Sequence, residues 1–171
     1  MKMPFLLLIP LMVAPLVAAD KQSPTTHLEK EVRHELVMLP HLNIFDNLEF
    51  RVDGNTVTLM GQVTNPVLKS DAENVIKRVE GVGNVVNQIE VLPLSPDDDR
   101  IRRAIYTTLV RQPQLQIYFM QSLPPIRIIV KNGHVSLEGI VATKTDSDVA
   151  KIQANTVPGV FSVTDNLRTE R

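Results

Sequence analysis

Two rhythms of apolar residues alternate along the chain. In "FRVDGNTVTLMGQV", residues 50–63, every second residue is apolar on both sides of Gly54-Asn55, which is the pattern of a β-hairpin with a two-residue turn. Before and after this hairpin, apolar residues recur every three or four positions, as on a helix with one buried face. A last alternating run follows at 85–91. The pattern predicts the order helix, strand, strand, helix, strand.

The whole pattern occurs a second time, 78 residues further on. The segments 48–91 and 126–169 align without a gap, so that "VDGNTVTLMGQV" matches "VKNGHVSLEGIV" and "GVGNVVNQI" matches "GVFSVTDNL". The helices before the hairpins align at an offset of 73, which leaves five additional residues in 114–125 of the second copy. Such a repeat indicates two small domains in tandem, 26–92 and 97–169. The residues that define the repeat are Gly61, Gly139, Gly81, Gly159, Asn87 and Asp165.

Each copy is predicted to be a small α+β sandwich. The class is α+β, with two αββαβ domains, each a three-stranded mixed sheet with two helices on one face. Asn65-Pro66 predicts the start of the second helix in copy one, and Thr145 with Asp148 predicts its start in copy two. We expect Gly61 and Gly139 on the buried sheet face, where a missing side chain lets a helix approach closely.

The first residues have the pattern of a secretory signal peptide. In residues 1–19, a lysine precedes an apolar run, and Ala18-Ala19 provides small residues before a cut ahead of Asp20. The alternative is an uncleaved membrane anchor, but the run is short and interrupted by prolines. The chain has no cysteine, so it cannot be a cysteine-acylated lipoprotein. We therefore expect a periplasmic or otherwise extracytoplasmic protein.

Composition argues against several function classes. A formal net charge of −1 gives no basic excess for nucleic acid. His27, His34 and His41 recur every seven residues, but about 10.5 Å of helix rise separates such neighbours, too far to share one metal ion. No catalytic set, cofactor motif or phosphate loop stands out. The sequence predicts a non-enzymatic protein without catalytic, cofactor-binding or metal-binding residues.

Asn87 and Asp165 occupy matched positions and share the parity of inward-facing strand residues. They could contact a ligand, or they could bind neighbouring backbone where the strand begins. The second interpretation is favoured because buried polar groups need partners, and local backbone groups are the common solution. The acidic run Asp97–Asp99 is interpreted as helix capping through the dipole.

The differences between the copies are the most informative features for function. The insertion in "QIYFMQSLPP" brings Ile117, Tyr118, Phe119 and Met120 together, either as an apolar contact for lipid or a partner, or as an extension of the core. Arg102, Arg103 and Arg111 lie near this segment, where they would meet anionic head groups or offset the acidic run. Ile129 and Ile140 replace polar residues of copy one, which suggests that copy two docks on copy one or on an external partner.

The motif V-x-x-G/N-x-V-x-L-x-G-x-V, followed by G-V-x-x-V-x-N and present twice, resembles the BON family (bacterial OsmY and nodulation). Copy two departs at its end, with Asp165-Asn166 in place of Asn87-Gln88. The resemblance implies a non-enzymatic envelope protein that associates with phospholipid surfaces and protects against osmotic or envelope stress. The expected partner is a phospholipid membrane surface or an envelope protein, and not nucleic acid. The alternative function is a structural adaptor of the envelope without lipid affinity; the oligomeric state has no signature in the sequence.

Overall fold

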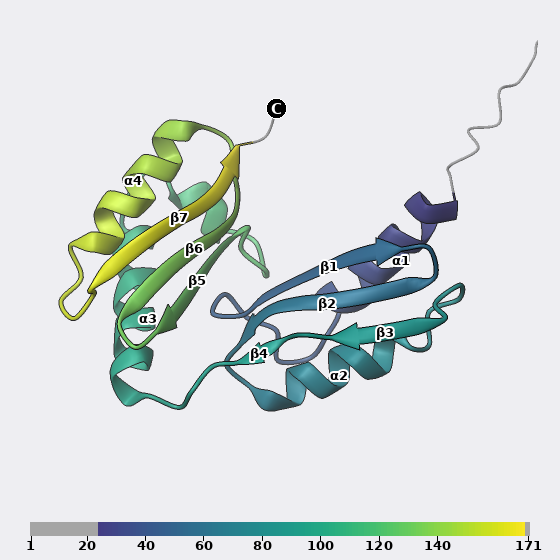
Figure 1. Ribbon diagram of the computed structural model, residues 1–171. Coiled ribbons are helices and arrows are strands. Elements are labelled where there is room, and N and C mark those ends of the chain that lie inside the picture. Colours follow the sequence, from purple (N-terminus) through teal and green to yellow (C-terminus); the bar gives the residue numbers. More distant parts are fainter. Residues whose placement is uncertain (1–23, 170–171) are drawn as a thin grey trace, which may run out of the picture.

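A computed structural model describes residues 24–169, which form two αββαβ domains in contact with each other (Figure 1). The predicted α+β class is confirmed. Domain one contains α1 (Pro24–Val37), β1 (Asn47–Asp53), β2 (Thr56–Val63), α2 (Pro66–Ile76), β3 (Asn84–Asn87) and β4 (Glu90–Val91). Domain two contains α3 (Pro96–Val110), the 3₁₀ helix η1 (Gln116–Phe119), β5 (Ile126–Lys131), β6 (His134–Val141), α4 (Lys144–Asn155) and β7 (Ser162–Thr169).

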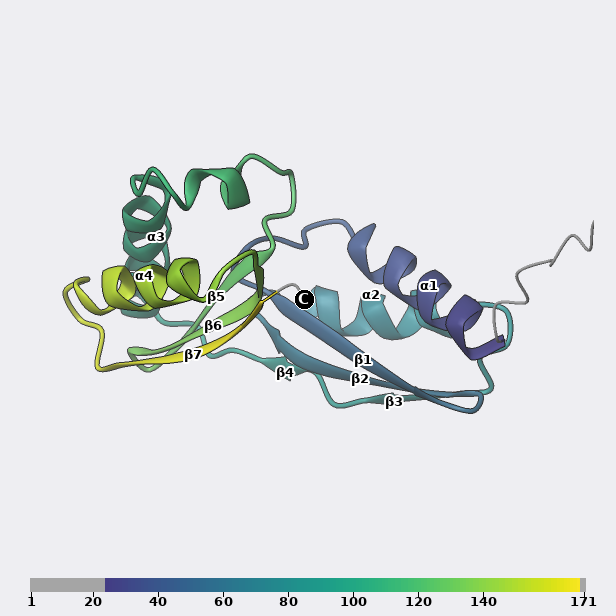
Figure 2. The ribbon, with the colours of Figure 1, turned by 90° about the horizontal axis from the view of Figure 1, so that it is seen from above.

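Both sheets have the predicted mixed topology. In domain one the central strand β2 is antiparallel to β1 and parallel to β3 and β4, which share the third-strand position. In domain two β6 is antiparallel to β5 and parallel to β7. The hairpin register is the one that two-residue turns produce, with Val52 opposite Val57 and Ile128 opposite Leu137. Figure 2 shows the helices of both domains on one side of the sheets, which leaves the other sheet faces uncovered on the same side of the molecule.

The residues that cap the helix starts are the predicted ones, except at α4, where the capping residue lies earlier in the chain. Asn65 caps α2, and its side chain accepts a hydrogen bond from the Val67 amide. Ser95 caps α3, and its side chain accepts a hydrogen bond from the Asp98 amide. α4 begins at Lys144, one residue before the predicted start near Thr145. Thr143 is the capping residue, and its hydroxyl bonds to both the amide and the carboxylate of Asp146.

The two repeated hairpin glycines, Gly61 and Gly139, are required by the backbone of the hairpin and not by the approach of a helix. Gly61 and Gly139 have φ of +105° and +122°, a region that L-residues with a side chain rarely adopt. A Cβ on Gly61 would collide with the carbonyl oxygen of Asn47, and one on Gly139 with that of Pro125. The expectation of close helix approach is therefore corrected: the neighbouring strand is what comes close. Gly81 and Gly159 lie in the turns that follow α2 and α4.

Each domain has its own apolar core, and the segment before β1 joins them. Leu59, Leu68 and Ile76 are fully buried in domain one, and the corresponding cluster of domain two contains Leu109 and Leu137. Ile44 and Phe45 belong to domain one by sequence but pack against the core of domain two. The Ile128 amide on β5 also donates to the Ile44 carbonyl oxygen at 2.9 Å. Domain one therefore covers part of an edge strand that would otherwise offer unpaired backbone groups.

The docking expectation for the two isoleucines is met by only one of them. Ile129 is buried and borders a hollow with Gln62 and Leu92 of domain one. Ile140 stays 42% exposed. An ion pair between Lys131 Nζ and Glu90 Oε1, 2.5 Å apart, also links the domains.

Candidate functional surface

The insertion of domain two forms η1, whose three-residue period separates inward from outward side chains. Leu115 and Tyr118, three residues apart, are buried against the core of domain two. Ile117 and Met120, also three residues apart, share the opposite side and are 67% and 84% exposed. In Figure 2 this segment, which follows α3 in green, lies on the helical side of the molecule. One turn thus supplies both a core anchor and an exposed apolar ridge.

Tyr118 is the anchor of this turn, so the expectation that it contacts a lipid or partner is corrected. Its hydroxyl lies 2.7 Å from Asp146 Oδ2 and accepts from the Ala142 amide at 2.8 Å. These bonds join η1 to the start of α4. A buried tyrosine whose hydroxyl has partners is held in one orientation, which fixes the direction of the neighbouring exposed residues.

Phe119 lies between the core and the surface. It is half-buried and packs on the core of domain two, and its ring meets that of Tyr106 edge to face, with centroids 5.7 Å apart. Tyr106 is itself exposed on α3. The aromatic pair therefore joins the exposed ridge of η1 to the outer side of α3.

The three candidate arginines have different surroundings. Arg102 is buried: its Nη2 donates to the Val130 carbonyl oxygen and its Nη1 to Asp99 Oδ1, both at 2.5 Å. It serves the edge of β5 and is not available to head groups, which corrects that expectation. Arg103 and Arg111 are exposed, and no carboxylate within residues 24–169 forms an ion pair with either.

Arg103 lies one helical turn before Tyr106 on α3, and Arg111 is the residue that caps the C-terminal end of this helix. We call the resulting surface the α3–η1 patch. It comprises Arg103, Tyr106, Arg111, Ile117, Phe119 and Met120. The patch thus groups the exposed apolar residues of η1 with two exposed arginines from the helix that precedes it in the chain.

Asn87, at the end of β3, and Asp165, within β7, each bind a backbone amide two residues further on and a group of the helix packed on the strand. Asn87 Oδ1 accepts from the Ile89 amide, and Asp165 Oδ1 accepts from the Leu167 amide, both at 3.1 Å. Asn87 also donates to the Lys69 carbonyl oxygen at 2.8 Å. This geometry agrees with local backbone bonding and leaves neither side chain aimed at a ligand site.

The Asp165 carboxylate additionally accepts from the Ser147 hydroxyl at 2.6 Å and lies 3.3 Å from Lys144 Nζ. Burial raises the pKa of Asp165, but the bonds from Ser147, the Leu167 amide and Lys144 outweigh it, so the pKa lies below its ordinary value. The role is structural in both domains.

Sequence reasoning missed the role of Asp98. Its carboxylate is buried and accepts from the amides of Asn132 and Gly133, each at 2.8 Å. The start of α3 thereby holds the turn of the β5–β6 hairpin. Three acids in a row look alike in sequence, and only the position of the hairpin distinguishes the middle one.

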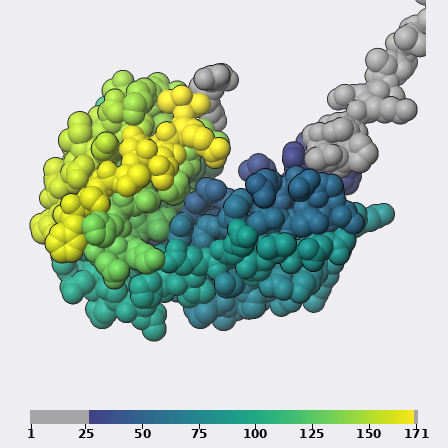
Figure 3. All heavy atoms as spheres, in the orientation of Figure 1, coloured from purple at the N-terminus to yellow at the C-terminus, as the bar shows by residue number. Residues whose placement is uncertain are grey.

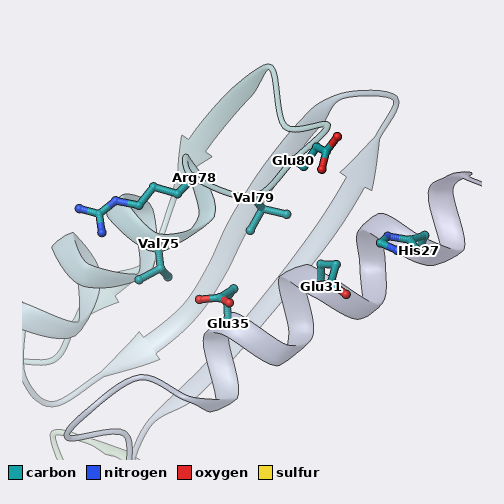
Figure 4. A pocket seen from close by; sticks show the side chains of 7 residues that line it. All are labelled: His27, Glu31, Glu35, Val75, Arg78, Val79 and Glu80. Carbon is teal, nitrogen blue, oxygen red and sulfur yellow. The ribbon is translucent and has the colours of Figure 1, made fainter.

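The groove between α1 and α2 is a weaker candidate (Figure 4). It has a volume of about 330 Å³ and is lined by His27, Glu31, Glu35, Val75, Arg78, Val79 and Glu80. Figure 4 shows the three carboxylates spread along the groove without converging on one point. Among the described residues no group of histidines and acids is placed to hold a metal ion.

The comparisons place these observations in a family. Residues 24–93 and 97–171 each match the BON domain, so the chain belongs to the BON family and carries the domain twice in tandem. No curated protein matches the sequence significantly. Within residues 24–169, no helix has the length and apolar character needed to cross a bilayer.

Two solved structures of CdsD, a structural protein of the type III secretion system of Chlamydia trachomatis, are distantly similar. The one of the C-terminal domain has 12% sequence identity and a TM-score of 0.34, and the match covers 84% of this chain and 98% of that chain. The other has 11% identity and a TM-score of 0.29, covering 85% of this chain and 94% of that chain. Likeness at this level carries no conclusion about function.

Proposed function

We propose that this tandem BON-domain protein is a non-enzymatic, extracytoplasmic protein that binds anionic phospholipid surfaces through the α3–η1 patch. The observation that carries the proposal is the exposure of Ile117 and Met120 in the segment that follows α3. Arg103 on that helix and its capping residue Arg111 are exposed as well, and they lack ion-pair partners among the described residues. The export signal expected in residues 1–19 lies outside the described residues. A role in protection against envelope or osmotic stress would follow from binding to the phospholipid surface of the envelope.

The energies are of the right size for reversible surface binding. Burying a large aliphatic side chain contributes about 1.5–3 kcal/mol, and each arginine near an anionic leaflet adds about 1 kcal/mol. Ile117 and Met120 with two arginines therefore suffice for a measurable affinity, while the loss of one apolar contact is large enough to detect. The hydrogen bonds of the Tyr118 hydroxyl already hold η1 in place, so little conformational entropy is lost when the segment binds a surface.

A second candidate, a protein-interaction adaptor of the envelope, is favoured by the edge strand β7. Ser162–Thr169 pairs with β6 on one side, and no other strand of the described residues pairs with it on the other. An open edge of this length can accept an extended peptide as an additional strand. The two candidates use different surfaces of domain two, so variants can separate them.

Co-sedimentation with vesicles tests the proposal. The purified protein should pellet with phosphatidylglycerol vesicles and much less with phosphatidylcholine vesicles, and Met120→Glu should weaken this binding by about tenfold or more. Ile152→Glu is a matched control, since Ile152 is also exposed but lies on α4. Binding that survives Met120→Glu, or that falls equally in both variants, would contradict the proposal.

A further inference from the structure

A cleft of about 400 Å³ lies between the two domains, and both of them line it. Figure 3 shows the notch between the blue domain one and the green and yellow domain two on this side of the molecule. Domain one contributes α1 and the start of β1, and domain two contributes the ends of its three strands. The cleft is separate from the α3–η1 patch, with which it shares no residue.

Three guanidinium groups line this cleft, each from a different element. Arg33 comes from α1, Arg127 from β5 and Arg168 from β7. Arg33 lies over the ring of Phe50, with its Cζ 5.4 Å from the ring centroid, within range of a cation–π interaction. Glu49 is the only carboxylate among the lining residues, so the lining carries a net charge of +2.

Arg127 is the half-buried member of the three. Its Nη1 donates to the Asn43 carbonyl oxygen at a long 3.4 Å. Within residues 24–169, no carboxylate lies within ion-pair distance of Arg33, Arg127 or Arg168. Burial lowers the pKa of Arg127, and the charge of Asp46 offsets this only in part. Glu138 lies opposite Arg127 in the β5–β6 pair but forms no ion pair with it. Arg127 is thus a partly desolvated cation that nearby carboxylates compensate only at a distance, and an anion in the cleft would add a direct partner.

The geometry points to a phosphate-binding site in the interdomain cleft, with Arg127 and Arg168 of domain two and Arg33 of domain one as the groups that hold the phosphate. A guanidinium presents a rigid fork of donors that matches phosphate oxygens, and three of them suit a group with several charged oxygens. The other walls include Leu48, Phe50 and Ile140, so an ester with a short apolar portion fits better than the bare ion.

Because both domains contribute, a bound phosphate would also hold them together. A ligand that binds only the docked arrangement stabilises it by mass action. Phosphate esters should therefore raise the melting temperature of the purified protein as well as bind to it.

Titration with inorganic phosphate and with sn-glycerol 3-phosphate tests the site, followed by nuclear magnetic resonance at the amides of Phe50, Arg127 and Arg168. We expect saturable chemical-shift changes and a lower dissociation constant for sn-glycerol 3-phosphate than for inorganic phosphate. The Arg168→Gln and Arg127→Gln variants should each bind about tenfold or more weakly. Arg168 is exposed, so its variant should fold even if that of Arg127 does not. Arg78→Gln, an exposed arginine outside both the cleft and the α3–η1 patch, should leave the titration unchanged. The absence of saturable shifts at constant ionic strength, or equal weakening by Arg78→Gln, would overturn the assignment.

The phosphate could come from a soluble ester or from a lipid head group, and vesicles distinguish the two. If Arg168→Gln weakens soluble phosphate binding and phosphatidylglycerol binding together, the site takes a lipid head group. If it weakens only the soluble titration, the ligand is a free phosphate ester. Both results support a phosphate site, and neither depends on the α3–η1 patch, which Met120→Glu tests by itself.

Discussion

Replacing Asp98 with alanine should destabilise domain two far more than the same change at Asp97. Both acids lie in the first turn of α3 and gain equally from the helix dipole, about 0.3–1 kcal/mol. Asp98, however, is buried and accepts from two hairpin amides at 2.8 Å. Hydrogen bonds to a charged group contribute about 1.5–3 kcal/mol each, which gives roughly 3–6 kcal/mol for the pair.

Part of this loss is recovered, because Asn132 is exposed and its amide can bind water in the variant. Gly133 has no such relief, since its bond to Asp98 is buried. We therefore expect Asp98→Ala to lower the free energy of unfolding by about 3 kcal/mol. Asp97 makes only a long 3.8 Å ion pair with Arg100, and Asp97→Ala should cost less than about 1 kcal/mol.

Urea unfolding followed by circular dichroism measures the difference directly. At unchanged slope, the shift in midpoint gives the change in stability. A difference of 2–3 kcal/mol corresponds to roughly 5–10 °C in melting temperature for a chain of this size. Equal losses in the two variants would show that the acidic run acts only through the dipole, and would refute the hairpin clamp.

Three further predictions follow from the fold. Burial raises the pKa of Glu138; the charge of Glu49 adds to this shift, while Asn166 and Arg168 oppose it. The protonated side chain therefore stabilises the fold below its ordinary pKa, and this contribution is lost as the pH rises through the pKa of the folded state. In urea unfolding, Glu138→Gln should stabilise the protein at about pH 7 but not at about pH 4, and an equal effect at both pH values would count against this reasoning. Because Ile44 and Phe45 pack on domain two, calorimetry should show one cooperative transition, and a fragment of residues 94–171 should be less stable or aggregate; two independent transitions would argue against docking. Mass spectrometry of the exported protein should find Asp20 at its N-terminus, and an intact chain in the membrane fraction would contradict cleavage.

The parts of the fold that could be predicted from sequence depend on local signals. The alternation around Gly54-Asn55 and Asn132-Gly133 determines strand register, because a two-residue turn pairs the residues on either side of it. Asn87 and Asp165 were also interpretable, because their bonds to an amide two residues on are local.

Contacts between distant segments could not be predicted in this way. The placement of Ile44 and Phe45 on the core of domain two has no periodic signal, since it depends on how the domains meet. In η1, four consecutive residues are apolar, so no alternation with polar residues indicates which side is buried. The sequence therefore could not show that Tyr118 is buried while Met120 is exposed. Arg102 was placed at head groups for the same reason: its partner is the Val130 carbonyl oxygen, 28 residues away.

The central claim, that the α3–η1 patch enters a lipid surface, can be tested with a single fluorescent residue. The chain has no tryptophan, so Met120→Trp and Phe161→Trp each introduce a single tryptophan whose fluorescence reports on that position alone. Both positions are highly exposed, at 84% and 77%, but Phe161 lies at the start of β7, outside the patch. With phosphatidylglycerol vesicles we expect a blue shift and quenching by brominated lipid tails for Met120→Trp alone. An unchanged Met120→Trp spectrum beside a shifted Phe161→Trp spectrum, or no shift in either, would contradict the account.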